Sequence, residues 1–380
     1  MLHSAVKKRA VLEFINKEII MLTKYQDNAH RERFRDTPLR KLFSTAWQAP
    51  VSKEASAPVN ETLPEGAIIL PIYNGEVASR WIHELSLPES LLVRATSNLL
   101  EIRLMNGAVV DRPIVIYHVT DGQDAAVQVD FNIVVTAEEG SQASFLLVEA
   151  GNGEYLNLGT MSVSLAESAN IEFVHAGINS KVGSSLFDFV ATQATESQLH
   201  YMSYQSQGAI TRSDIAFSVE GEGAYSELNV LNIAEGREHI SHVVDLDHKV
   251  PNCSSNQQVK NILKDRAEAL FDAQIHVFQD AQKIDADQMT RSLLLNDGAR
   301  ALTIPRLLIY ADDVRCTHGA TVGFIEPDHL FYLRSRGISA EEAKKMLIRA
   351  YAVEIVDTIR SESIRDWLAH RLDHDIAILL

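Results

Sequence analysis

Two residues with metal-binding chemistry lie two positions apart, Cys316 and His318, in the segment IYADDVRCTHGATVG. Thiolate sulfur and imidazole nitrogen are good ligands for zinc and iron. If this segment is a strand, residues two apart point to the same face, so both side chains could reach one metal ion. Two ligands do not complete a site, and the others would have to come from elsewhere in the fold or from another chain. The alternative is that Cys316 is an ordinary buried cysteine beside a hydrogen-bonded His318.

A second group of potential ligands lies in REHISHVVDLDHKVPNC, which contains His239, His242, His248 and Cys253. Strand alternation places His242 and His248 on one face and the other two residues on the opposite face. A single tetrahedral site would therefore need a turn between them. Because spacing alone is a weak signal for a metal site, the sequence favours structural roles for these side chains. A stand-alone metal-dependent enzyme would instead use His242, His248 and Asp245.

The short signatures of several enzyme classes are absent. The chain has no G-x-S-x-G, no G-x-x-x-x-G-K-[ST] and no C-x-x-C. Its glycine-rich stretches, VEGEG and GNG, do not lead from a strand into a helix, as a phosphate-binding loop does. Without such a loop the chain should not hydrolyse nucleotides by itself, and we expect it not to be an enzyme.

Composition and charge restrict the partners and the compartment. The 380 residues carry a formal net charge of -16, whereas surfaces that bind nucleic acids or anionic membranes need clustered Lys and Arg. Two cysteines, Cys253 and Cys316, form no disulfide framework, which favours a reducing compartment. The N-terminal segment lacks the continuous apolar stretch of a signal peptide, and no uncharged apolar run reaches about 18 residues. The sequence therefore predicts a cytoplasmic protein with no nucleic-acid partner and no membrane partner.

The candidate ligands lie in a region of strand-length apolar runs, from about residue 66 to 325. Segments such as AIILPIY, RPIVIYHV and ASFLLVEA are rich in β-branched and aromatic residues and are bounded by Gly, Asn, Asp or Ser. No helix is expected in this region. The runs predict a large, mainly β domain that must position the candidate ligands.

A loose repeat runs through this region, in which a small or polar corner precedes a strand. The aligned corners are Gly140, Ser168, Ser197, Gly223, Arg266 and Gly298, at steps of 28, 29, 26, 43 and 32 residues. Repeated units of strand, turn and strand suggest a stacked β-helix. A large β-sandwich also has regularly spaced strands, and the pattern alone does not separate the two folds.

Helical patterns flank the β region, which is expected to span residues 61–326. Residues 1–60 combine an amphipathic helix, over about residues 5 to 25, with a linker rich in Pro, Ser, Ala and Glu. In residues 327–380, a capping box that begins at Ser339 precedes an apolar stripe. This last segment has too few apolar residues for a core of its own, so it should dock on the β region or on a partner.

Three motifs carry a resemblance to a known family: YADD at 310–313, CTHGATVG at 316–323 and FYLRSRG at 331–337. Together they closely resemble the C-terminal part of the SufB/SufD family, the scaffold proteins of the Suf iron–sulfur cluster assembly system. HKVPNCSSNQ and AEALFDAQIHV extend the likeness upstream, so that it covers about residues 200 to 360. Leu333 stands where SufB-like chains have a cysteine, and the chain is therefore similar to the SufD branch.

The resemblance implies a mainly β fold, a right-handed parallel β-helix flanked by N-terminal and C-terminal helical regions. It also implies two partners, a SufB-like paralogue that pairs with the chain and a SufC-like ATPase that binds the C-terminal helical region. A homodimer of the isolated chain is a further pairing that it allows. The nascent cluster would form at the interface with SufB, which would supply the ligands that Cys316 and His318 lack.

His318 matches a histidine implicated at that interface, and Cys316 is its neighbour. The resemblance makes both of them candidate ligands of transient iron or a transient iron–sulfur cluster, with no cofactor bound tightly to the isolated chain. The expected partner-binding residues are Phe331, Tyr332, Leu333, Arg334, Arg336, Met346, Leu347 and Ala350. Two alternatives remain: a stand-alone metal-binding β-helix enzyme, and a purely structural β-helix in which Cys316 and His318 fill the core.

Overall fold

A computed structural model describes residues 33, 36–50 and 62–380. The chain forms two compact units, residues 1–46 and residues 47–380. The described part of the first unit contains helix α4 (Arg40–Ser44). The amphipathic helix expected near the N-terminus and most of the predicted linker lie outside the described residues.

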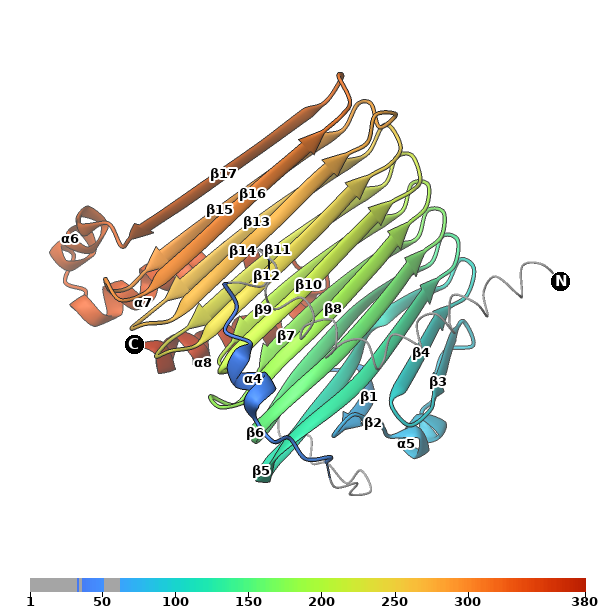
Figure 1. The fold of residues 1–380 in the computed structure, drawn as a ribbon, viewed down its shortest axis with the longest axis horizontal. Coiled ribbons are helices and arrows are strands. Elements are labelled where there is room, and N and C mark those ends of the chain that lie inside the picture. Colours follow the sequence, from blue (N-terminus) through green and yellow to red (C-terminus); the bar gives the residue numbers. More distant parts are fainter. Residues whose placement is uncertain (1–32, 34–35, 51–61) are drawn as a thin grey trace. The chain divides into compact units, whose positions relative to one another are not determined.

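The second unit is built mainly of β-strands (Figure 1). Its first elements are short: β1 (Ile68–Tyr73), β2 (Glu76–Val77), α5 (Ser79–Glu84), β3 (Leu91–Ala95) and β4 (Leu99–Leu104). Two long strands follow, β5 (Val109–Ala137) and β6 (Gln142–Leu165). The remaining strands are β7 (Asn170–Ile178), β8 (Ser184–Gln193), β9 (Gln198–Ser206), β10 (Ile210–Val219), β11 (Tyr225–Ala234), β12 (His239–His248), β13 (Ser254–Leu263), β14 (Glu268–Val277), β15 (Asp285–Leu294), β16 (Arg300–Ile309) and β17 (Arg315–Phe324). Three helices complete the unit, α6 (Pro327–Ser335), α7 (Ala340–Val356) and α8 (Glu362–Leu379).

The strands stack as a parallel β-helix. After β6, odd-numbered strands pair with odd-numbered strands and even-numbered strands with even-numbered ones, always in parallel. We call these two stacks the odd face (β7, β9, β11, β13, β15 and β17) and the even face (β8, β10, β12, β14 and β16), and β5 and β6 contribute to both. This parallel pairing excludes a β-sandwich, whose sheets are antiparallel. The prediction of a mainly β, parallel β-helix with helices near its ends is confirmed.

The corners of the β-helix explain where the predicted repeat fails. At six successive corners that lead from the even to the odd face, from the β5–β6 corner to the β14–β15 corner, one residue has a left-handed backbone: Gly140, Ser168, Glu196, Gly223, Asn252 and Lys283. The predicted repeat follows this edge from Gly140 to Gly223. Its next step passes over Asn252 and reaches Arg266, which lies at a corner leading from the odd to the even face. That step is wrong because a small or polar residue before a strand is common to both edges.

Helix α5 contradicts the expectation that no helix lies between residues 66 and 325. Its six residues bury Ile82 and leave Trp81 exposed. A helix of this length makes fewer than two turns, so it leaves no readable helical period in the sequence.

The helices α7 and α8 cover the outer side of the odd face. Their apolar side chains form one buried cluster with outward-pointing strand residues, among them Val174, Met202 and Leu231 on the strands and Ile348 and Leu372 on the helices. Within the parts of the chain that the structure describes, no helix is long and apolar enough to cross a membrane.

Polar contacts hold these helices in place. The Glu172 carboxylate on β7 accepts hydrogen bonds from the backbone N–H groups of Arg360, at 2.5 Å, and Ser361, at 2.9 Å. Ser361 is the N-cap of α8 and Arg360 precedes it, so the carboxylate holds the chain just before the helix begins. The ammonium of Lys260 on β13 donates to the carbonyl of Tyr351 at 2.8 Å and so ties α7 to the same face.

Inside the β-helix, one register position carries polar side chains along the stack, interrupted by Gly177 of β7. His118, Glu149, Gln205, Asn232, Asn261 and Ser292 lie in this row. Neighbours satisfy one another: Asn232 donates to Asn261 at 2.8 Å, and Asn261 donates to Ser292 at 2.9 Å. Buried polar groups of this kind are stable only while their hydrogen bonds are made.

Three buried histidines should make folding sensitive to mild acid. Burial lowers the pKa of His118 to about 4, that of His242 to about 3 and that of His248 to about 4. In the unfolded chain an imidazole binds a proton below about pH 6.5. Between pH 7 and pH 5 the unfolded state therefore gains protons that the native state does not bind. Each histidine should then lower the free energy of unfolding by about 2 kcal/mol over this range.

The measurement compares the wild type with His242→Gln, whose side-chain amide can still donate to Asn232 but does not titrate. Denaturant unfolding at pH 7 and pH 5 should show a smaller loss of stability in the variant, by about 2 kcal/mol. Burial raises the pKa of Glu238 to about 7, which stabilises the native state in acid, but this effect is present in both proteins and cancels. Equal pH dependence in the two proteins would show that His242 does not contribute.

Candidate functional site

Strand β17 carries both candidate ligands and is the last strand of the odd face. It pairs with β15 along its whole length, from the pair Asp285–Arg315 to the pair Leu294–Phe324. No strand in the described part of the chain forms a ladder with its other side, and Figure 1 shows it at the end of the stack. Its free edge presents backbone N–H and C=O groups that a neighbouring strand would otherwise satisfy.

Cys316 and His318 differ in their surroundings on this strand. Cys316 is half-buried and packs against the core of the β-helix. Burial, with a smaller contribution from the charge of Asp285, raises the pKa of the Cys316 thiol. The thiol therefore stays protonated at neutral pH and is a poor metal ligand in the isolated chain.

His318 is exposed and makes no hydrogen bond with any residue that the structure describes. Its imidazole is thus available to a partner or to a metal ion, and it does not fill the core. Across the described ranges no group of three or more His, Cys, Asp or Glu side chains could hold a metal ion. Within the described residues, Cys316 and His318 are thus joined by no further ligands.

The histidines inside β12 have structural surroundings. The Nε2 atom of His242 lies 3.0 Å from Asn232 Oδ1, and that of His248 lies 3.0 Å from Ser255 Oγ. Both side chains are fully buried and point into the β-helix, as the alternation predicted. Each therefore makes a hydrogen bond within the polar interior.

The other members of this group lie apart from His242 and His248. His239 is on the outer side of β12, with its Nδ1 atom 3.6 Å from the Glu268 carboxylate. Asp245, at an odd position of the same strand, shares that outer side. Cys253 is buried at the corner before β13, donates to the carbonyl of Gly221 at 3.3 Å, and has a pKa raised by burial. These residues do not converge on one site.

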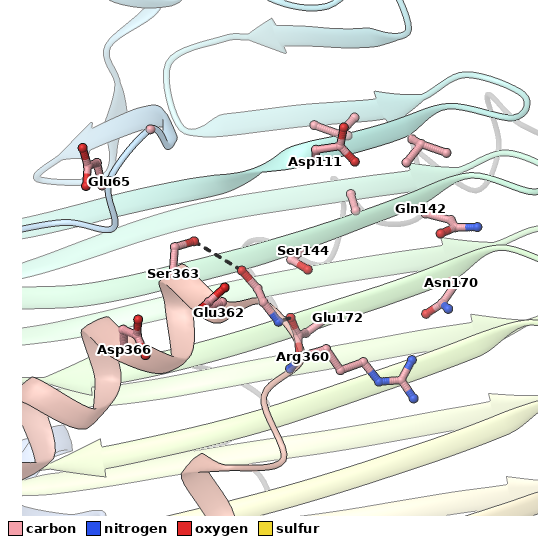
Figure 2. A pocket seen from close by; sticks show the side chains of 15 residues that line it. Glu65, Asp111, Gln142, Ser144, Asn170, Glu172, Arg360, Glu362, Ser363 and Asp366 are labelled. Carbon is pink, nitrogen blue, oxygen red and sulfur yellow. Dashed lines mark hydrogen bonds between the residues drawn. The ribbon is translucent and has the colours of Figure 1, made fainter.

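A pocket of about 740 Å³ lies elsewhere on the odd face, between the starts of β5, β6 and β7 and the start of α8. Figure 2 shows acidic and amide side chains around it, with Glu65, Asp111, Glu172 and Arg360 among the labelled residues. Glu172 already accepts hydrogen bonds there from the amides of Arg360 and Ser361, directly before α8. This pocket is therefore explained by the docking of α8 and is separated from β17 by the strands β9 to β15.

The helix α6 presents the expected partner-binding residues to solvent. None of its nine residues is buried. Phe331 is 73% exposed and Tyr332 is 58% exposed, which is unusual for aromatic side chains. Arg334 and Arg336 are exposed as well, and Leu333 is half-buried.

The helix α7 docks on the odd face, while the partner-binding residues expected on it lie outside the buried contact. Ile348 and Ala352 are buried against the odd face, whereas Met346 and Ala350 are exposed and Leu347 is half-buried. Apolar periodicity shows that a helix is amphipathic, but in a helix with two adjacent apolar stripes it does not show which one meets the sheet. Of the apolar stripe read from the sequence, Ala343 and Ile355 are buried, whereas Met346 and Ala350 lie at the surface.

Three exposed apolar residues along the open end of the β-helix were not among the predicted binding residues. Tyr310 is 62% exposed, Phe324 is 53% exposed and Val322 is 52% exposed. A pocket of about 390 Å³ joins this end of the β-helix to α6 and α7 and is lined by Val322, Phe324, His329, Leu347 and Tyr351, among others. The available signal was that no strand-length run follows Phe324, so the apolar side chains of the last turn have no next turn to cover them.

The sequence of this chain matches a family of known proteins. The family model described as "SUF system FeS cluster assembly, SufBD core domain" matches residues 118–351, a stretch that includes β17 and α6. The iron–sulfur cluster assembly protein SufD of Escherichia coli K12 is 28% identical over 293 residues, which cover 76% of this chain and 68% of that protein.

Two further relatives show the same likeness at lower coverage. A SufBD family iron–sulfur cluster assembly protein of Synechocystis is 32% identical over 213 residues, 56% of this chain and 47% of its own length. The protein ABCI7, chloroplastic, of Arabidopsis thaliana is 28% identical over 240 residues, 62% of this chain and 50% of its own length. The chain thus spans about half of these two relatives. Because the family model matches more than half of the 380 residues, the chain belongs to the SufBD family of SUF-system iron–sulfur cluster assembly proteins.

Proposed function

We propose that the chain is a SufD-type scaffold subunit that pairs through β17 with a SufB-like paralogue. At the interface with this paralogue it supports iron acquisition and formation of the nascent cluster. The observation that carries the proposal is an exposed histidine, His318, on an open edge strand. In this role the chain has no turnover of its own, and iron and the growing cluster are its cargo. Its two free cysteines fit a reducing compartment, which we propose is the cytoplasm.

The end of the odd face suits a partner that adds β-structure. A strand from the partner would satisfy the free backbone groups of β17. It would also bury Val322 and Phe324, at about 25 cal/mol for each Å² of apolar surface removed from water. A second copy of this chain could occupy the same edge when no paralogue is present, which gives the homodimer.

Docking at this edge would also complete the metal site. The partner would supply the ligands that this chain lacks, and exclusion of water would strengthen the bond between iron and His318. Cys316 has a smaller part in this arrangement, because its thiol is kept protonated by burial.

The outer surface of α6 and α7 is proposed as the binding surface for a SufC-like ATPase. It combines the exposed aromatic rings of Phe331 and Tyr332 with the exposed Met346 of α7 and the guanidinium groups of Arg334 and Arg336. Aromatic and arginine side chains dominate the binding energy of many protein interfaces. Nucleotide hydrolysis would be supplied by this partner, because the chain has no phosphate-binding loop of its own.

Replacing His318 with alanine tests the metal site. Folding and pairing with the SufB-like partner should be unchanged, because the side chain is exposed and makes no hydrogen bond with the described part of the chain. Iron and acid-labile sulfide in the complex should fall by roughly 10- to 100-fold or more, since even an outer hydrogen-bond partner of a metal site contributes this much. Cys316→Ser should have a smaller effect.

The matched control is His374→Ala, which removes another exposed histidine from α8 and should leave the iron content unchanged. If His318→Ala retains its iron, the cluster forms elsewhere. If it unfolds the chain, His318 is a structural residue.

The double substitution Phe331→Ser and Tyr332→Ser tests the ATPase surface. Deletion of residues 327–372 would remove it too, but α7 and α8 cover the odd face, so point variants avoid exposing the core. We expect binding of the SufC-like ATPase to weaken about tenfold or more, the usual effect of removing interface aromatics, with an unchanged circular dichroism spectrum. Val182→Ser removes an exposed apolar side chain from the β7–β8 connection and should leave binding intact. Full ATPase binding by the double variant would refute the assignment.

A further inference from the structure

The residue directly beneath His318 is Gln288, a buried side chain on β15. The parallel register pairs Gln288 with His318 on one side and with Gln257 of β13 on the other. In-register neighbours in a sheet lie about 4.8 Å apart, so these three residues form a stack that ends at the open edge. Gln288 is 1% exposed and Gln257 is 0% exposed.

Among the described residues, the side-chain amide of Gln288 has a hydrogen-bond partner for its nitrogen but none for its oxygen. Its Nε2 atom donates to Gln257 Oε1 at 3.2 Å. Its Oε1 atom is buried and has no hydrogen-bond partner among the residues described. A buried carbonyl oxygen without a donor is unfavourable. Because the nitrogen of Gln288 is used towards the interior, the oxygen is the acceptor left for the side of His318.

A metal-binding imidazole usually has an oxygen acceptor for the N–H group of its second ring nitrogen. A neutral ring has one N–H group and one nitrogen with a free lone pair, and only the second can bind a metal ion. Metal-binding histidines usually donate their remaining N–H to a protein oxygen, which fixes both the tautomer and the orientation of the ring. His318 has no such hydrogen bond to any of the residues described in the isolated chain.

We propose that Gln288 is the positioning residue for His318. When a partner covers the edge, Gln288 Oε1 accepts a hydrogen bond from one N–H of the His318 ring. The other ring nitrogen then faces the interface with the partner and acts as the metal ligand. Gln257 contributes by holding the Gln288 amide in this orientation. The inference rests on the proposed function, because it takes His318 as an iron ligand.

The opposite orientation of the amide would have a different consequence. If Gln288 presented its Nε2 atom to His318, it would donate to the free lone pair of the ring. The remaining N–H of His318 would then face the interface with the partner and could not bind a metal. The hydrogen bond from Gln288 Nε2 to Gln257 Oε1 favours the acceptor orientation.

Three variants, each in complex with the SufB-like paralogue, separate these arrangements. Gln288→Met keeps the size of the side chain without its hydrogen bonds, and Gln288→Glu keeps only acceptor atoms. Thr290→Val is the matched control. Thr290 is also buried on β15, and its Oγ1 atom also lacks a partner, but it pairs with Ala320 rather than with His318.

The first readout is the imidazole tautomer of His318, measured without metal by nitrogen NMR on a complex with isotope-labelled histidine in this chain only. The measurement is made at a pH at which the nitrogen shifts themselves show a neutral ring. One tautomer should predominate in the wild type, in Gln288→Glu and in Thr290→Val, whereas Gln288→Met should show a mixture. Identical tautomer ratios in the wild type and Gln288→Met, or loss of the preference in Gln288→Glu, would overturn the proposal.

The second readout is the iron content of the complex. It should fall roughly tenfold or more in Gln288→Met and stay near the wild-type value in Gln288→Glu and Thr290→Val. Equal losses in Gln288→Met and Thr290→Val would mean that any buried defect in β15 disturbs the edge, and the positioning role would be rejected. If His318→Ala leaves the iron content unchanged, the proposed function fails, while the tautomer measurement still decides what Gln288 does.

Discussion

The backbone hydrogen bonds between successive turns of the β-helix are the interaction on which the rest of the structure depends. Even the corners take part: the N–H of Ser168 bonds to the carbonyl of Thr195 at 2.9 Å, and the N–H of Glu196 bonds to that of Glu222 at 2.8 Å. Each interior turn thus satisfies its backbone with the turns on either side. The last turn has no such neighbour in the described chain, so an open end follows from the architecture and not from any single residue.

The same stacking decides which side chains meet inside. Residues close to one repeat apart in the sequence become neighbours, so the ring of Phe173 stacks on that of Tyr201 with centroids 5.8 Å apart. Burial acts to raise the pKa of Glu149, but the hydrogen bond and charge of His175 outweigh it and hold the pKa below its ordinary value. By the same rule Gln288 lies beneath His318, and a buried amide therefore reaches the edge where a metal site is proposed.

The helical tail divides into a part that belongs to the β-helix and a part that does not. α7 and α8 bury an apolar stripe on the odd face. The carboxylate of Glu172 accepts hydrogen bonds from the amides of Arg360 and Ser361, directly before α8. α6 buries nothing and begins three residues after β17 ends. The surface proposed for the ATPase and the edge proposed for the paralogue therefore adjoin each other, with the pocket near Phe324 and Leu347 between them.

Much of this protein could be predicted from local patterns in the sequence. The strand-length runs predicted a mainly β domain, and the capping box predicted the start of α7, where the Ser339 hydroxyl accepts a hydrogen bond from the N–H of Glu342. Alternation correctly placed His242 and His248 on one face, because the side-chain period of a strand is a local property. The choice between a β-sandwich and a β-helix did not follow from these patterns, since both folds use the same runs and corners.

Only the tertiary structure decided what is exposed. Nothing in the local pattern of residues 315–324 distinguishes a last strand from an interior one, because burial depends on whether another turn stacks against it. The structure makes His318 exposed and Cys316 half-buried for this reason. Met346 faces outwards in the same way, because α7 packs on the sheet through Ile348 and Ala352. Periodicity can be read from the sequence, whereas the surface that meets each face is a property of the assembled fold.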